Sequence, residues 1–292
     1  MSLTSKRRTE TTRPIFWSNR QRSYISRTAD WDEFPNGRWG DSRSPAYGEL
    51  QPLSVSLRLG GNDILAKWGT PVQFHDICNV FAKFCRGMID TLPWSDQPRA
   101  NETSVISEQL AKINECGFLT INSQPRVDGA HSNHRLYGWG PRNGYVYQKA
   151  YLEFFTSPDR LLRLLDEISQ DPMVTYHAVN KKGDVLTNAT SSEPNAVTWG
   201  VFPCAEVIQP TIVEATSFLA WKDEAFELGY EWAKLYESAS PATATLLREI
   251  MDTHYLVNIV HNDYRHKDEF AIFEPFFNIP HGGRNLKPAV DV

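Results

Sequence analysis

The sequence is poor in cysteine and has no long apolar run. Its four cysteines, Cys78, Cys85, Cys116 and Cys204, form no C-x-x-C pair and are too few for a disulfide framework. This usage is typical of reduced thiols in the cytosol, so we expect a cytoplasmic location. No apolar stretch approaches the roughly 20 residues that span a bilayer. The first ten residues also lack the apolar segment of a secretory signal. We therefore expect no membrane partner.

The chain also lacks a strong excess of one charge. The net charge is −5 over 292 residues, which gives no reason to expect a nucleic-acid partner. The local exception is residues 6–28, where seven lysines and arginines accompany one acid, Glu10. Phe16, Trp17 and Tyr24 interrupt this basic stretch, and a disordered tail would lack such aromatics. We predict an extended linker over residues 1–40, one domain over 41–280 and a flexible tail over 281–292.

Signatures of catalysis are missing as well. The sequence contains no G-x-S-x-G, H-E-x-x-H or S-x-x-K motif and no kinase signature set. His131 and His134 are three residues apart, but no carboxylate or cysteine stands beside them at ligand spacing, which favours a surface loop over a metal pair. The glycine-rich loop at 138–144 lacks the spacing of a dinucleotide fingerprint or a P-loop. Glu153 has no partner that the sequence can identify. These absences favour a binding or regulatory module over a stand-alone enzyme.

What is present centres on residues 101–125, NETSVISEQLAKINECGFLTINSQP. Apolar residues at i, i+4 and i+7 predict a helix with one buried stripe, and Gly117 is suited to its C-terminal stop. A short strand then begins at Phe118, and Asn122–Pro125 has the composition of a turn. Two interpretations of the polar residues stay open at this point. They cap the helix and make the turn, or they form a polar ligand pocket in which Glu102 accepts from a diol.

The rest of the chain predicts a mixed α/β (α+β) fold, because helical and strand patterns alternate irregularly. Helices are predicted at 63–68, 72–88, 158–168, 217–236 and 241–254, and strands at 145–155, 174–179, 185–187, 195–203, 207–213 and 256–260. Residues 127–135 are polar and rich in turn formers, which predicts a loop. A last apolar segment covers 270–277.

Several long strings resemble one family. They are RPIFW (13–17), WDEFPNGRWG (31–40), ETS (102–104), LTINSQP (119–125), GWGP (138–141), QKAYLEFF (148–155), NAVTWG (195–200), IQPT (208–211) and WKDEAF (221–226). In this order, from about residue 7 to about residue 264, they resemble the C-terminal regulatory domain of eukaryotic methylenetetrahydrofolate reductases.

The resemblance implies a fold and a function. The family domain has two side-by-side β-sheets flanked by helices, follows an extended linker and forms a homodimer. It binds S-adenosylmethionine, which inhibits the reductase allosterically, and S-adenosylhomocysteine, which competes and relieves inhibition. The catalytic half of the family is a barrel with FAD that reduces 5,10-methylenetetrahydrofolate with NAD(P)H, and a barrel takes about 200 residues or more. This chain begins in the linker after that barrel, so we expect it to be catalytically inert alone and to hold no cofactor.

The resemblance also implies a set of ligand contacts. Carried over residue by residue, they are Glu102, Thr103, Thr120, Ser123, Thr198, Thr211 and, in the linker, Ser18. Glu102 would accept from both ribose hydroxyls, a charge-assisted contact worth roughly 1.5–3 kcal/mol. Thr120, Ser123, Thr198 and Thr211 would bind the carboxylate and ammonium of the amino-acid tail. Ser18 stands where animal enzymes carry alanine. Further family contacts come from linker residues upstream of Lys6.

Two other functions stay open. The first is a stand-alone S-adenosylmethionine-dependent enzyme such as a methyltransferase, which needs a glycine-rich loop directly after a strand. Here the glycine-rich loop precedes its strand, which counts against that function. The second is a dimerisation scaffold with no ligand, and the retained polar set argues against it.

Overall fold

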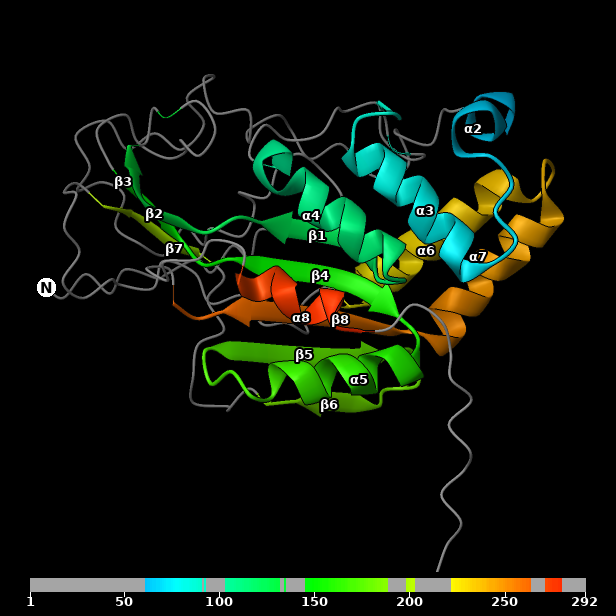
Figure 1. Cartoon of the computed structure of the whole chain (residues 1–292). Helices are drawn as coiled ribbons and strands as arrows, with labels where there is room; N and C mark the ends of the chain where they lie inside the picture. Colours follow the sequence, from blue (N-terminus) through cyan, green and yellow to red (C-terminus); the bar gives the residue numbers. More distant parts are fainter. Residues whose placement is uncertain are drawn as a thin grey trace, which may run out of the picture.

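The computed structural model describes residues 61–90, 92, 103–131, 134, 145–188, 198–202, 222–263 and 271–279 (Figure 1). The helices in these ranges are α2 (Gly61–Trp68), α3 (Phe74–Cys85), α4 (Thr103–Glu115), α5 (Pro158–Ile168), α6 (Lys222–Tyr236), α7 (Pro241–Thr253), the 3-10 turn η3 (Ala271–Phe273) and α8 (Glu274–Phe277). The strands are β1 (Leu119–Gln124), β2 (Val127–His131), β3 (Tyr145–Gln148), β4 (Tyr151–Thr156), β5 (Val174–Asn180), β6 (Val185–Thr187), β7 (Thr198–Phe202) and β8 (Tyr255–His261).

The strands form two sheets, as the family resemblance implies. The larger sheet has the order β1-β4-β8-β5-β6 and the smaller has the order β2-β3-β7. Every strand pair in the described part of the chain is antiparallel. The chain passes directly from β1 into β2 and from β3 into β4, so two connections link the sheets side by side (Figure 1). The mixed α/β class with flanking helices is confirmed, whereas the predicted linker lies outside the described residues.

One face of the larger sheet packs against α2, α3, α6 and α7. Trp68, Phe81 and Trp232 meet there edge to face, with ring centroids 5.1–6.1 Å apart, and all three side chains are at most 2 % exposed. Phe155 of β4 joins them through an edge contact with Phe226 of α6 at 5.5 Å. Aromatic pairs in such geometry add to the stabilisation that comes from buried area. This cluster explains where much of the sequence's aromatic content goes.

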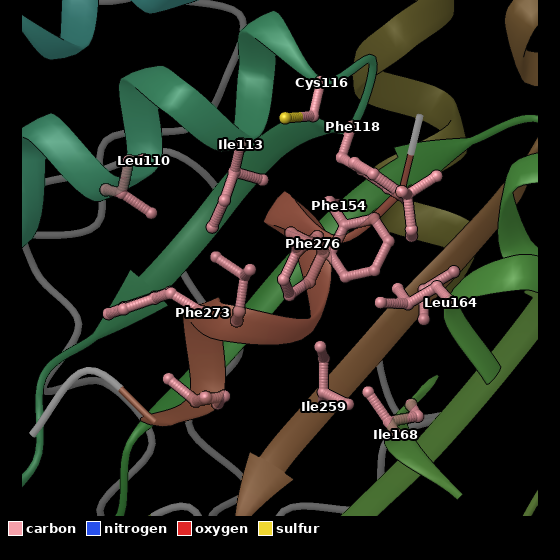
Figure 2. Packing of buried hydrophobic residues seen from close by; sticks show 14 of the residues in the cluster. Leu110, Ile113, Cys116, Phe118, Phe154, Leu164, Ile168, Ile259, Phe273 and Phe276 are labelled. Atoms are coloured by element: carbon pink, nitrogen blue, oxygen red, sulfur yellow. The ribbon is translucent and has the colours of Figure 1, made fainter. Parts of the chain in front are cut away.

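The other face packs against α4, α5 and α8 (Figure 2). Phe118, Phe154 and Phe276 form a triangle of edge contacts with centroids 4.9–5.5 Å apart. The predicted stripe of α4, Ile106, Leu110 and Ile113, is buried in the same cluster. The sheet is therefore covered on both sides, which is why its strands carry so few exposed residues.

Three local predictions were wrong. Asn122–Pro125 was expected to be a turn, but β1 continues through Gln124 because Asn122 and Ser123 pair with β4. The loop expected at 127–135 contains strand β2, which pairs with β3. The single strand expected at 145–155 is two strands, β3 and β4, interrupted where the chain crosses between the sheets. In each case pairing with a distant strand overrode local composition.

The other described elements agree with their predicted positions within a few residues. α3 starts at Phe74, after the predicted Val72, because the side chain of Asp76 accepts hydrogen bonds from the N–H groups of Val72 and Gln73. The strand expected at 207–213 lies outside the described residues, and the division into linker, domain and tail stays a prediction. None of the helices described is long and apolar enough to cross a bilayer.

Candidate functional site

The helix α4 and the strand β1 run in opposite directions. Gly117, with φ +82°, reverses the chain between them, and a residue with a side chain rarely adopts that conformation. The first residue of α4, Thr103, therefore lies toward the end of β1 that carries Ser123 (Figure 1). The start of α4 and the end of β1, about 20 residues apart in the sequence, thus lie at the same end of the helix–strand pair.

That end of β1 is also the junction between the two sheets. Ser123 pairs with Leu152 of β4, and Thr198, the first residue of β7, pairs with Gln148 of β3. Gln148 and Leu152 are separated by three residues: the two that join the sheets and the first residue of β4. The fold therefore brings the backbones of Thr103, Ser123 and Thr198 to one region.

A β-bulge sets the direction of the polar side chains of β1. Thr120 and Ser123 are three residues apart and would point to opposite faces of a regular strand. The register shifts between Thr120 and Asn122, so Thr120 pairs with Phe154 and Ser123 with Leu152. Because Phe154 and Leu152 share the face beneath α4, Thr120 and Ser123 share it too. Both side chains are buried.

Thr120 lies further from the junction and already has a partner. It is three residues from Ser123, about 10 Å along a strand. Its hydroxyl accepts a hydrogen bond from Asn114 Nδ2 at 2.6 Å, and its N–H donates to Asn114 Oδ1 at 3.1 Å. A hydroxyl has further bonding capacity, so this pairing leaves room for a ligand contact. Asn114 was not anticipated from the sequence, because one asparagine near a helix end looks like an ordinary C-terminal residue.

The remaining predicted contacts are only partly described. Ser18, Glu102 and Thr211 lie outside the described residues. Thr103 and Thr198 are placed by their backbone alone. Within the described ranges, no group of three or more histidines, cysteines and carboxylates could hold a metal ion.

A buried carboxyl lies behind the same stretch of β1. Glu153 of β4 pairs with Asn122, and its side chain is fully buried. Burial raises the pKa of Glu153 to about 8, although hydrogen bonds from Asn258 and Asn122 act in the opposite direction. Asn258 Nδ2 donates to Glu153 Oε1 at 3.1 Å. The sequence left Glu153 without an identified partner, and only the strand pairing shows its surroundings.

Comparison with known proteins identifies the family. The family model described as "MTHFR, SAM-binding regulatory domain" matches residues 1–278. "Methylenetetrahydrofolate reductase 1" of Schizosaccharomyces pombe is 49% identical over 275 residues, which are 94% of this chain and 45% of that protein. "Probable methylenetetrahydrofolate reductase (NADH)" of Oryza sativa is 47% identical over 272 residues, 91% of this chain and 45% of that protein.

A third relative, "Methylenetetrahydrofolate reductase 2" of Saccharomyces cerevisiae, is 44% identical over 273 residues, 92% of this chain and 46% of that protein. The chain spans slightly less than half the length of these curated relatives, and the part matched is the regulatory one. The chain belongs to the family of S-adenosylmethionine-binding regulatory domains of methylenetetrahydrofolate reductase.

Proposed function

We propose that this chain is the allosteric sensor of a methylenetetrahydrofolate reductase. It binds S-adenosylmethionine as the inhibitory ligand and S-adenosylhomocysteine as the competing ligand that relieves inhibition. The controlled reaction is the NAD(P)H- and FAD-dependent reduction of 5,10-methylenetetrahydrofolate to 5-methyltetrahydrofolate, in a catalytic barrel of the same polypeptide. We also propose a cytoplasmic homodimer. The family match and the convergence of Thr103, Ser123 and Thr198 at the sheet junction support the proposal.

The ligand contacts divide by chemistry. Glu102 stands one residue before α4 and would accept hydrogen bonds from both hydroxyls of the ribose. A set of four hydroxyl side chains would bind the carboxylate and ammonium of the amino-acid tail: Thr120, Ser123, Thr198 and Thr211. The dipole of α4 also favours a carboxylate near the N-terminus of this helix. Ser18 in the linker would approach the sulfonium methyl.

The difference between the two ligands is one methyl group and one positive charge. An effector shifts a conformational equilibrium only through contacts that differ between the two states. The basic linker, residues 6–28, is the proposed moving element, because it connects the sensor to the barrel. Ligand bound against Ser18 would hold the linker in one position and thereby reposition the barrel.

The antiparallel sheets argue against a stand-alone methyltransferase. Such enzymes bind the ligand after a parallel strand, at a glycine-rich turn that opens a helix. Strand pairs in the part of this chain that the structure describes are antiparallel throughout. The sensor function therefore remains the one proposed.

Isothermal titration calorimetry of this chain with each ligand tests the proposal. Saturable binding of both ligands at one shared site is the expected result. Ser123→Ala should weaken binding about tenfold, because one hydrogen bond to a charged group is lost. The backbone bond from the Ser123 N–H to Asn122 Oδ1, 3.0 Å, would survive that change. Ser169→Ala, at an exposed hydroxyl after α5, is the matched control and should bind as wild type. Absence of binding by the wild type would overturn the sensor function.

A further inference from the structure

A row of polar side chains crosses the larger sheet on the face opposite Ser123. The strand register aligns Asn122 of β1, Glu153 of β4, Asn258 of β8 and His177 of β5. Residues that pair across neighbouring strands point to the same face of the sheet. Each side chain of this row therefore lies beside the next one, in the order Asn122, Glu153, Asn258, His177. All four are buried, with Glu153 0% and Asn258 1% exposed. Buried polar rows are retained only where their members satisfy one another.

Two acceptors in this row lack a donor. Glu153 Oε2 and Asn258 Oδ1 accept no hydrogen bond in the described part of the chain. The Glu153 carboxyl and the Asn258 amide are already joined by one hydrogen bond, from Asn258 Nδ2 to Glu153 Oε1 at 3.1 Å. The two unmet atoms are the other oxygen of that carboxyl and the oxygen of that amide. Protonation turns Glu153 Oε2 from an unmet acceptor into a donor, and Asn258 Oδ1, on the group that Glu153 already contacts, is an unmet acceptor in the same row. The neutral carboxylic acid therefore fits this row better than the carboxylate.

The row connects to the ligand strand through Asn122. Its amide donates a hydrogen bond to the Glu153 carboxyl. Its Oδ1 accepts the N–H of Ser123 at 3.0 Å. Asn122 is also the residue at which the register shift of β1 ends. Glu153 thus holds the side chain of Asn122, and Asn122 in turn holds the backbone of the bulge.

We propose that Glu153, in its neutral form, is a positioning residue of the ligand site, because through Asn122 it fixes the bulge that places Thr120 and Ser123 on one face. The inference rests on the proposed function, since it concerns the same ligand site. Glu153 touches no ligand in this role, because its side chain lies on the opposite face of the sheet. Its effect is to hold the strand, and it therefore acts on both ligands equally.

Ionisation of Glu153 disrupts this arrangement. As a carboxylate, Glu153 has no proton to donate, so Asn258 Oδ1 stays without a donor and a full charge is buried among these strands. The other titratable side chain in the row is His177, and α6 contributes Tyr236 to the apolar cluster on this face, where burial raises the pKa of Tyr236. Neither group is a fixed cation that would compensate the new charge. The cost of burying this uncompensated charge is relieved when the strands around it shift, and the bulge loosens with them.

The test is a pH profile of affinity. Binding of S-adenosylmethionine and of S-adenosylhomocysteine is measured by calorimetry from pH 6.5 to 9 for the wild-type chain, Glu153→Gln and Glu153→Ala. Gln keeps a neutral side chain of the same shape, so Glu153→Gln should bind at every pH as the wild type does at pH 6.5. The wild type should lose about five- to tenfold relative to Glu153→Gln as the pH rises through 8. Glu153→Ala should bind both ligands weakly at every pH. The ligand's own ammonium titrates in this range for every variant, so the ratio of affinities is the readout.

Two comparisons separate positioning from other effects. Glu249→Gln, at an exposed glutamate on α7, should reproduce the wild-type profile. Amide exchange at Ser123, followed by NMR without ligand, should be faster in Glu153→Ala than in Glu153→Gln, because the Asn122 contact is loosened. Equal exchange in these two variants would overturn the proposal whether or not ligand binds.

The binding outcomes are equally distinct. A constant ratio of wild-type to Glu153→Gln affinity across the pH range overturns the positioning role and leaves the sensor function standing. A change for S-adenosylmethionine alone also overturns it, because Glu153 would then act by charge on the sulfonium. No binding by any variant overturns the sensor function itself, and the inference fails with it.

Discussion

Asn114 is the side chain that joins α4 to β1, and its removal should be costly. It is fully buried, donates to Leu110 O at 2.8 Å and to Thr120 Oγ1 at 2.6 Å, and accepts from the Thr120 N–H. Asn114→Ala leaves a buried N–H without a partner and creates a cavity. We expect the free energy of unfolding to fall by about 2–4 kcal/mol, measured by urea denaturation.

A double-mutant cycle with Thr120→Val isolates the side-chain bond. The coupling between the two changes should be about 0.5–1.5 kcal/mol, because the residues share one neutral hydrogen bond. Asn188→Ala provides a control asparagine, since Asn188 bonds the backbone of β5 far from α4. A coupling near zero would mean that the bond from Asn114 Nδ2 to the Thr120 hydroxyl has no net energetic weight, and that Asn114 holds Thr120 through its backbone N–H alone.

Gly117 determines how α4 returns into β1. At φ +82° a new Cβ would also lie 2.9 Å from Arg160 Nε, whose guanidinium donates to the carbonyl of Cys116. Gly117→Ala combines backbone strain with displacement of Arg160, so we expect a loss of about 2–3 kcal/mol in unfolding free energy. Urea denaturation measures it, and ligand affinity should fall too, because α4 and β1 shift against each other.

Gly69 is the matched control at the end of α2. Its φ is +66°, and a Cβ there would meet nothing within 4 Å. Gly69→Ala therefore reports backbone strain alone, about 1 kcal/mol. Equal losses in the two variants would show that the contact with Arg160 has no energetic weight.

The same helix–strand pair shows what the sequence can predict. Local signals located α4 and its stop, because apolar spacing and a glycine after the last turn are written within 15 residues. The end of β1 was misjudged because Asn122 and Ser123 are turn formers by composition. Their burial depends on β4, about 30 residues later in the chain. Asn114 and Glu153 were missed as functional candidates for the same reason: a polar residue looks solvated until its distant partner is known.

The candidate site likewise divides into what the sequence could predict and what only the fold shows. The family strings named its residues, but only the fold explains why Thr120 and Ser123 share a face, since the bulge between them is not readable from residue types. The convergence of Ser123 and Thr198 likewise depends on pairing between segments about 75 residues apart. Spatial proximity of that kind arises from topology, which local patterns do not encode.

The pH dependence of the whole molecule's stability combines the fully buried Glu153 with the partly buried His254, whose pKa values shift in opposite directions. Burial lowers the pKa of His254 from 6.5 to about 4, so the unfolded chain binds more protons between these values and stability rises with pH there. Burial raises the pKa of Glu153 from 4.5 to about 8, so the folded chain binds more protons and stability falls as pH rises across that window. The two trends oppose each other between pH 4.5 and 6.5, and the fall caused by Glu153 remains above 6.5.

We therefore expect the free energy of unfolding to decrease from pH 6.5 to 8, with a slope of at most about 1.4 kcal/mol per pH unit. The lowered pKa values of Glu108 and Asp252 affect stability only below about 4.5, outside this window. Glu153→Gln should abolish the decrease and expose the rise due to His254 at lower pH, whereas Glu249→Gln should keep the wild-type curve. Urea denaturation at closely spaced pH values measures all three. The same decrease in Glu153→Gln would mean that another group causes it, and the assignment of the decrease to the buried Glu153 carboxyl would be wrong.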